Sequence, residues 1–144
     1  MTEEKRIFEF EGFQTASPRI AEAFTYIRQL ETAAGAGADE TAAALSERLG
    51  AAAGLVSRLK HALNEFLRET RGTELDDVPE NSLAGRTAAL VSEIADQVFL
   101  PPSGTFSEAD LHERLKKTDF LASKLPFLTA GLDAGEDLSE NKSM

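Results

Sequence analysis

The 144-residue sequence has no cysteine, only two histidines and no long uninterrupted apolar run. Without cysteine the chain cannot form disulfides, thiolate-bound zinc sites, iron–sulfur clusters or a thiol nucleophile. A bilayer span needs an apolar run of about 18–20 residues, so we expect no transmembrane segment. The first residues, MTEEKRIFEFEGF, alternate charged side chains with phenylalanine and lack the apolar stretch of a signal peptide. We therefore expect a cytoplasmic protein.

The formal net charge is −10, but the acidic excess lies outside the segments that have helical periodicity. Residues 17–71 carry seven basic and seven acidic side chains, and residues 82–130 carry five basic and six acidic ones. The remaining excess is −2 in residues 1–16, −4 in residues 72–81 and −3 in residues 131–144. Acidic connections favour solubility, and no basic surface is present to displace counterions from phosphates. We therefore expect no binding to nucleic acid.

Four segments have the apolar periodicity of α-helices, at about residues 17–34, 39–71, 82–100 and 107–125. Ser17 and Asp39 suit the N-caps of the first two helices. Ser107 and Asp110 have the spacing of a capping box at the start of the fourth, with aspartate in place of the usual glutamate.

The second segment carries the strongest folding signal in the chain, a seam of apolar residues spaced alternately four and three apart. The seam consists of Leu45, Leu49, Ala52, Val56, Leu59, Leu63 and Phe66. Further apolar residues on both sides widen it into a face that can contact two or more neighbouring helices. With short connections between the helices, this pattern predicts an all-α fold, an antiparallel four-helix bundle.

The two ends of the chain lack helical periodicity. Residues 1–16 form an N-terminal arm in which Phe8 and Phe10 alternate with glutamates, which predicts an extended segment ending at Gly12. Pro126 is expected to close the fourth helix, and from Gly131 the composition becomes polar and acidic. The sequence therefore predicts a bundle domain at 17–130 and a disordered acidic tail at 131–144.

The histidines do not indicate an active site. His61 lies opposite the seam, and a solvent-facing histidine on a helical bundle resembles the phospho-acceptor of histidine phosphotransfer domains. Those domains usually have a lysine and a glycine shortly after the histidine, and the run HALNE has neither. His61 is thus interpreted as a surface residue, and His112 lies on another helix without an inward-facing acidic partner. We expect no catalytic residues and no enzyme activity.

Metal and cofactor sites are also not expected. The pairs His61–Glu65 and Glu108–His112 are spaced four apart, whereas di-iron bundles require Glu-x-x-His units, which the sequence lacks. The carboxylates of residues 72–81 do not match the spacing of a calcium-binding loop with its central glycine. No phosphate-binding glycine loop is present.

Two features are candidates for partner binding. The run Gly50-Ala-Ala-Ala-Gly54 leaves one turn of the long helix nearly bare, which either permits close approach of another backbone or reflects an alanine-rich helix that tolerates glycine. In the arm, the apolar residues Ile7, Phe8, Phe10 and Phe13 lie outside every helical pattern. They pack either against the chain's own bundle or against a partner or a second copy.

The function that these observations favour is a non-enzymatic protein–protein interaction or adaptor module that binds another protein or itself, possibly as a homodimer. The alternative is a surface-coating or chaperone-like helical protein that covers apolar material, as phasins and secretion chaperones do. That alternative requires an apolar face on the second helix larger than the bundle can bury.

Overall fold

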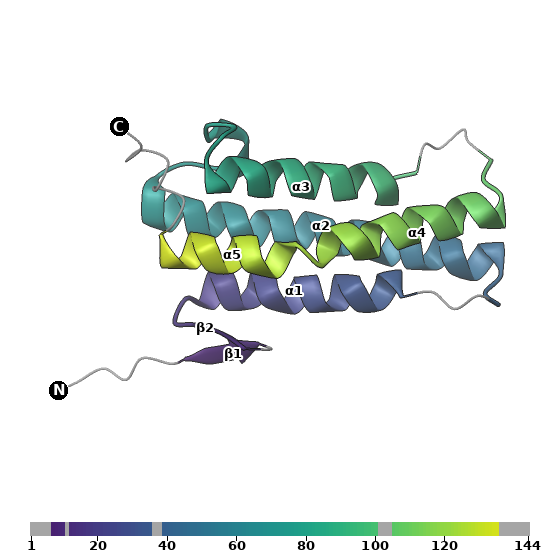
Figure 1. Cartoon of the computed structure of the whole chain (residues 1–144), viewed down its shortest axis with the longest axis horizontal. Helices are drawn as coiled ribbons and strands as arrows, with labels where there is room; N and C mark the ends of the chain where they lie inside the picture. The colour runs from purple at the N-terminus through teal and green to yellow at the C-terminus, as the bar shows by residue number, and fades with distance from the viewer. Residues whose placement is uncertain (1–6, 11, 36–38, 101–104, 136–144) are drawn as a thin grey trace.

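The computed structural model describes residues 7–10, 12–35, 39–100 and 105–135, and most of them are helical. Figure 1 shows long helices lying along one common axis, with a small strand pair beside them. The elements in chain order are β1 (Phe8–Phe10), β2 (Phe13–Thr15), α1 (Pro18–Ala34), α2 (Ala42–Arg71), the 3-10 helix η1 (Leu75–Asp77), α3 (Leu83–Val98), α4 (Glu108–Ala122) and α5 (Leu125–Ala134). The expected all-α class is confirmed, and none of the helices in these ranges combines the length and apolar character of a membrane span.

Serine and threonine side chains cap the helix starts. Ser17 Oγ accepts a hydrogen bond from the Ile20 amide at 3.2 Å, as expected for the N-cap of α1. Ser107 and Asp110 form the predicted capping box at the start of α4. The expected start of α2 at Asp39 is wrong, because Thr41 is the N-cap and its Oγ1 accepts from the amide of Ala44 at 3.2 Å.

Helix α2 contributes the centre of the core. All seven residues of its apolar seam are buried, and Leu55, Ala62 and Leu67 beside the seam are buried as well. The seam therefore faces several neighbours, since α2 contacts α1, α3 and α4. Arg48 fixes the start of α2 against the end of α1, because its Nη1 donates to the carbonyl oxygens of Thr32 and Ala33 at 3.3 and 3.1 Å.

The last part of the fold differs from the prediction. The expected fourth helix ends at Ala122, and α5 follows it end to end in Figure 1. Pro126 does not close a helix but lies in the first turn of α5, where its missing N–H costs nothing. The described chain thus has five α-helices where the sequence predicted four.

The expectation of a disordered tail from residue 131 onward is wrong for residues 131–134, which belong to α5. Leu125, Thr129 and Leu132 recur at helical spacing and are fully buried, so the apolar face of α5 holds it to the core. Arg71 Nη2 adds a hydrogen bond of 2.9 Å to the Leu132 carbonyl oxygen. The domain therefore extends past its predicted end at residue 130, and residues 136–144 lie outside the described part.

The N-terminal arm is extended, as predicted, but it also folds back on itself. Strands β1 and β2 pair antiparallel, with Phe8 opposite Thr15 and Phe10 opposite Phe13. Gly12 does not simply end the segment: its φ of 93° places it in the turn of a hairpin. Thr15 Oγ1 then accepts from the Ser17 amide at 3.0 Å, which fixes the hairpin at the start of α1.

Candidate interaction surface

The aromatic residues of the arm pack on the chain's own helices. The Phe10 and Phe13 rings stack on Phe24 of α1, with ring centroids 5.3 and 5.5 Å away. Phe13 also meets Phe127 of α5 edge-on at 5.5 Å, and the Arg28 guanidinium lies 5.8 Å from the centre of the Phe10 ring. The hairpin therefore covers the flank formed by α1 and α5.

Of the four partner-binding candidates in the arm, three are half-buried by this packing and one remains exposed. Phe10 and Phe13 are half-buried in the aromatic cluster on Phe24, and Phe8 is half-buried too. Ile7 remains 56% exposed beside β1. Of these residues, Ile7 is the one with the largest apolar surface in contact with solvent.

The glycine candidates Gly50 and Gly54 lie on the exposed side of α2. A Cβ atom built at either position meets nothing within 4 Å, so neither glycine permits a close approach within the described fold. That role belongs to Gly85 in the first turn of α3, where a Cβ would lie 2.0 Å from the carbonyl oxygen of Pro79. Close approach of another backbone among the described residues is therefore not the reason for Gly50 and Gly54.

Among the described residues, the aromatic side chains with the largest exposed fractions lie on α4 and α5. Phe120 is 62% exposed and Phe127 is 70% exposed. They are seven residues apart, and Ser123 and Lys124 between them keep right-handed helical dihedrals, so the two positions lie near the same outer meridian. The Phe120 ring lines a groove beside α3, whereas the Phe127 ring meets Phe13 of β2. That meridian is opposite the buried face that includes Leu111 and Leu115.

Lysines flank these two rings. Lys124 Nζ lies 4.5 Å from the centre of the Phe120 ring. Lys117 lines a groove of about 450 Å³ between α3 and α4, together with Phe120 and Leu121 of α4 and with Glu93, Asp96 and Gln97 of α3. Within the described ranges no carboxylate forms an ion pair with Lys117 or Lys124. We name Lys117, Phe120, Lys124 and Phe127 the α4–α5 aromatic surface.

Sequence reasoning did not find this surface. The signal was present, because Phe120 falls in the turns opposite the predicted inward residues Leu115, Thr118 and Ala122. Phe127 could not be placed in the same way, because Pro126 predicts the end of the fourth helix before it.

A second groove lies between α2, η1 and α3, with a volume of about 310 Å³. Buried Val56, Leu75 and Val91 form its apolar base, and the Lys60–Asp76 ion pair spans 3.7 Å at its rim. Phe99, which is 51% exposed, lines it as well. The small side chains of α3 that line it leave this part of the surface hollow.

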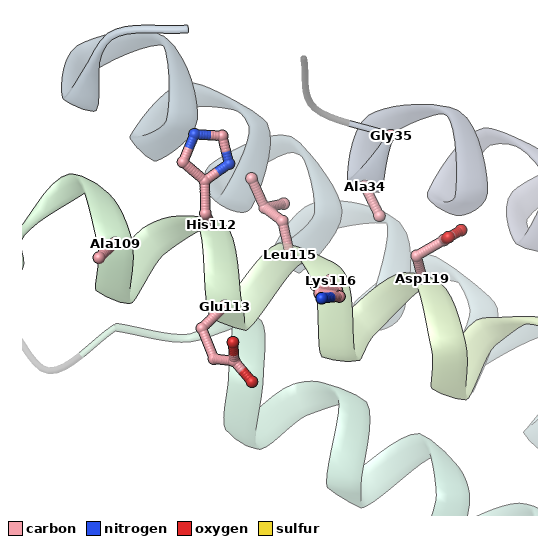
Figure 2. Close-up of a pocket in the computed structure, with 8 residues that line it drawn as sticks. All are labelled: Ala34, Gly35, Ala109, His112, Glu113, Leu115, Lys116 and Asp119. Carbon is pink, nitrogen blue, oxygen red and sulfur yellow. The ribbon is translucent and has the colours of Figure 1, made fainter. Parts of the chain in front are cut away.

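A third hollow lies between the end of α1 and α4 and has a volume of about 540 Å³ (Figure 2). His112, Glu113, Lys116 and Asp119 line it. In Figure 2 the His112 ring and the Glu113 carboxylate point away from each other, on opposite sides of α4. Because acid–base chemistry requires groups within hydrogen-bond reach of a common point, this hollow does not assemble a catalytic pair.

The other histidine and the carboxylates do not form a site in the described ranges either. His61 is exposed, and the Glu65 carboxylate pairs with Arg68. No group of three or more potential metal ligands occurs in the part of the chain that the structure describes.

The shifted pKa values also belong to ion pairs that hold elements together. Hydrogen bonds that Arg19, Arg48 and Arg68 donate to the carboxylates of Glu69, Glu40 and Glu74, respectively, raise the pKa values of these arginines. The Arg19–Glu69 pair joins α1 to α2, and the Arg68–Glu74 pair joins α2 to the segment before η1. These are structural contacts at the surface, and each contributes little to stability.

No known protein family, curated protein or solved structure matches this chain. The geometry of the described residues is therefore the basis for any functional proposal.

Proposed function

We propose that the chain is a non-enzymatic interaction module that binds another protein through the α4–α5 aromatic surface. In this proposal the helices form an antiparallel bundle of four rods, with α4 and α5 together as the fourth. The bundle supplies a rigid support, and the outer side of its fourth rod supplies the contact.

The exposure of Phe120 and Phe127 is the observation that carries the proposal. Both rings lie where a bundle helix ordinarily has polar residues, and most of each ring remains exposed, although Phe127 also meets Phe13 of the hairpin edge-on. A buried aromatic ring removes about 150–250 Å² of surface from water, so two rings on one meridian offer a large apolar area to a partner. Aromatic side chains are enriched among the residues that dominate binding energy at interfaces.

The lysines favour a particular kind of partner. Lys124 lies beside the Phe120 ring and has no ion pair among the described residues, so acidic side chains of a partner can approach it. Lys117 shares its groove with Glu93 and Asp96 but forms no ion pair with either of them. We therefore propose an amphipathic partner segment that places apolar residues on the rings and acidic residues beside the lysines.

Co-purification from the cells that naturally make the protein tests this proposal. The full chain is compared with F120S/F127S and with the control R58S/H61S, which changes two exposed residues on the outer side of α2. We expect a defined partner with the wild type and the control, and its loss with F120S/F127S. Circular dichroism shows whether each variant stays folded.

The co-purified protein is then produced separately and titrated into each variant. Loss of a binding hot spot of about 2 kcal/mol weakens binding roughly 30-fold, and we expect at least this effect for F120S/F127S. K117E/K124E should also weaken binding and reduce its dependence on salt. Equal affinity of the wild type and F120S/F127S would contradict the proposal.

The alternative of a surface-coating or chaperone-like protein gains no support from α2, because the apolar seam of this helix is buried. Liposome titration tests it, and increased helix content on lipid would favour it over protein binding. We also propose a cytoplasmic location for the module, which cell fractionation tests.

A further inference from the structure

The groove between α3 and α4 has sides of opposite charge. Its α3 side contains Glu93 and Asp96, and its α4 side contains Lys117, Phe120 and Leu121. The α3 side is therefore acidic, whereas the α4 side is basic and supplies apolar surface through Phe120 and Leu121.

These charges are not neutralised within the described part of the chain. Glu93, Asp96 and Lys117 are exposed, and no ion pair joins them across the groove or to other described residues. Lys124, whose Nζ lies 4.5 Å from the centre of the Phe120 ring, continues the basic side and has no ion pair in these ranges either. Both sides of the groove thus offer charges to an occupant.

The two charged sides follow the helix axes. Glu93 and Asp96 lie about one turn apart on α3, and Phe120 lies about one turn after Lys117 on α4. Lys117 and Lys124 are seven residues apart, which is about 10 Å along a helix. Since α3 and α4 are neighbours, an occupant that lies along them contacts both sides over several turns (Figure 1).

We propose that this groove binds an amphipathic α-helix of the partner whose two flanks carry opposite charges. Its apolar face packs on Phe120 and Leu121, its basic flank faces the carboxylates of α3, and its acidic flank faces the lysines of α4. This inference rests on the protein-binding function proposed above and adds the basic flank. A helix with two acidic flanks would bring carboxylates against Glu93 and Asp96, which is unfavourable.

The charges also determine the direction of the bound helix. Reversing a helix within the groove exchanges its flanks, so that its basic flank then faces the lysines and its acidic flank faces the carboxylates. One direction therefore pairs opposite charges on both sides, and the other direction places like charges together on both sides.

Selection from a displayed peptide library tests the charges of the two flanks. Each peptide has about 18 residues, which is long enough for a helix, with leucines on one face and glutamines on the opposite face. The flank positions are randomised among lysine, glutamate and glutamine. On the full wild-type chain we expect enrichment of peptides with lysine on one flank and glutamate on the other.

Neutral variants of the chain assign each flank to one side of the groove. E93Q/D96N should remove the preference for lysine and keep that for glutamate, whereas K117Q/K124Q should do the opposite. Each variant should weaken binding of an enriched peptide by about two- to tenfold, because exposed ion pairs are individually weak. Circular dichroism shows whether each variant stays folded.

The control E47Q/D77N separates the groove from the net charge of the protein. It removes two negative charges, as E93Q/D96N does, but from exposed positions on α2 and η1 outside the groove. It should leave both charge preferences and the affinity unchanged.

A spin label at the peptide N-terminus tests the direction of binding. An enriched peptide is compared with a version in which the charges of the two flanks are exchanged. We expect the label to broaden amide signals at the start of α4 with one peptide and in α5 with the other. The same pattern from both peptides would contradict the role of charge in setting the direction.

The inference and the proposed function fail in distinguishable ways. Enriched peptides that require Phe120 and Phe127 but have two acidic flanks, or no charge preference, would overturn the inference alone. Peptides that bind F120S/F127S as tightly as the wild type would contradict both. A library that yields no binder would refute the groove as a helix-binding site. Sedimentation velocity of the protein alone tests a second copy, since a dimer that F120S/F127S abolishes would assign the groove to self-association and overturn the inference.

Discussion

Replacement of Gly85 by alanine should destabilise the protein, although it adds a better helix former to α3. A Cβ at this position would lie 2.0 Å from the Pro79 carbonyl oxygen and 2.7 Å from that of Glu80. Real Cβ atoms do not approach backbone oxygen this closely, so the segment at Pro79 must move. The same oxygen of Pro79 accepts hydrogen bonds from the amide and the hydroxyl of Ser82, at 3.1 and 2.6 Å.

Two opposing contributions decide the size of the effect. Alanine in place of glycine favours a helix interior by about 1 kcal/mol. Overpacking against a fixed neighbour costs about 1–3 kcal/mol, and each weakened hydrogen bond costs about 0.5–1.5 kcal/mol more. We therefore expect Gly85→Ala to lower the free energy of unfolding by about 1–5 kcal/mol, because the collision and the two weakened hydrogen bonds outweigh the gain in helix propensity.

Urea denaturation followed by circular dichroism measures this free energy. Gly50→Ala and Gly54→Ala are the matched controls, because a Cβ at either position meets nothing within 4 Å. Each control should raise the free energy of unfolding by about 1 kcal/mol. If Gly85→Ala proved as stable as the controls, the close contact with Pro79 would be wrong.

The same denaturation assay checks three further predictions. Thr129 Oγ1 is buried and has no hydrogen-bond partner among the described residues, so Thr129→Val should stabilise the protein by about 1 kcal/mol. Thr118→Val should give no such gain, because the Thr118 hydroxyl donates to the Arg114 carbonyl oxygen at 2.8 Å. Leu132→Ala should cost about 2–5 kcal/mol, whereas a residue of a disordered tail would change stability by less than about 0.5 kcal/mol. Phe24→Leu removes two ring stacks and should lower the free energy of unfolding by about 1–3 kcal/mol. Amide hydrogen exchange in β1 and β2 should also become faster in this variant. Unchanged exchange would show that the stacks do not hold the hairpin.

The helices could largely be predicted from local patterns. The seam of α2 and the capping box at Ser107 depend on residues within one or two turns, and local sequence determines them. The N-cap predicted for α2, Asp39, is wrong. The structure uses Thr41, whose hydroxyl reaches the Ala44 amide.

The errors occurred where tertiary contacts override local composition. Residues 131–144 are polar and acidic overall, yet Leu132 continues the buried face that begins at Leu125. Local sequence also does not show which glycine is required by a close approach. Gly85 is required because the chain passes close to it at Pro79, which is a tertiary contact. The hairpin had a sequence signal in the glycine between two alternating segments, but its docking on Phe24 depends on the position of α1.

Site-specific photo-crosslinking in living cells shows most directly whether the α4–α5 aromatic surface contacts a partner. A photoreactive amino acid is placed at position 120, and a control carries it at position 61, where His61 is exposed on α2. We predict a discrete adduct with a second protein from position 120 and no such adduct from position 61. Absence of an adduct at position 120, or the same adduct from both positions, would contradict a binding role for this surface.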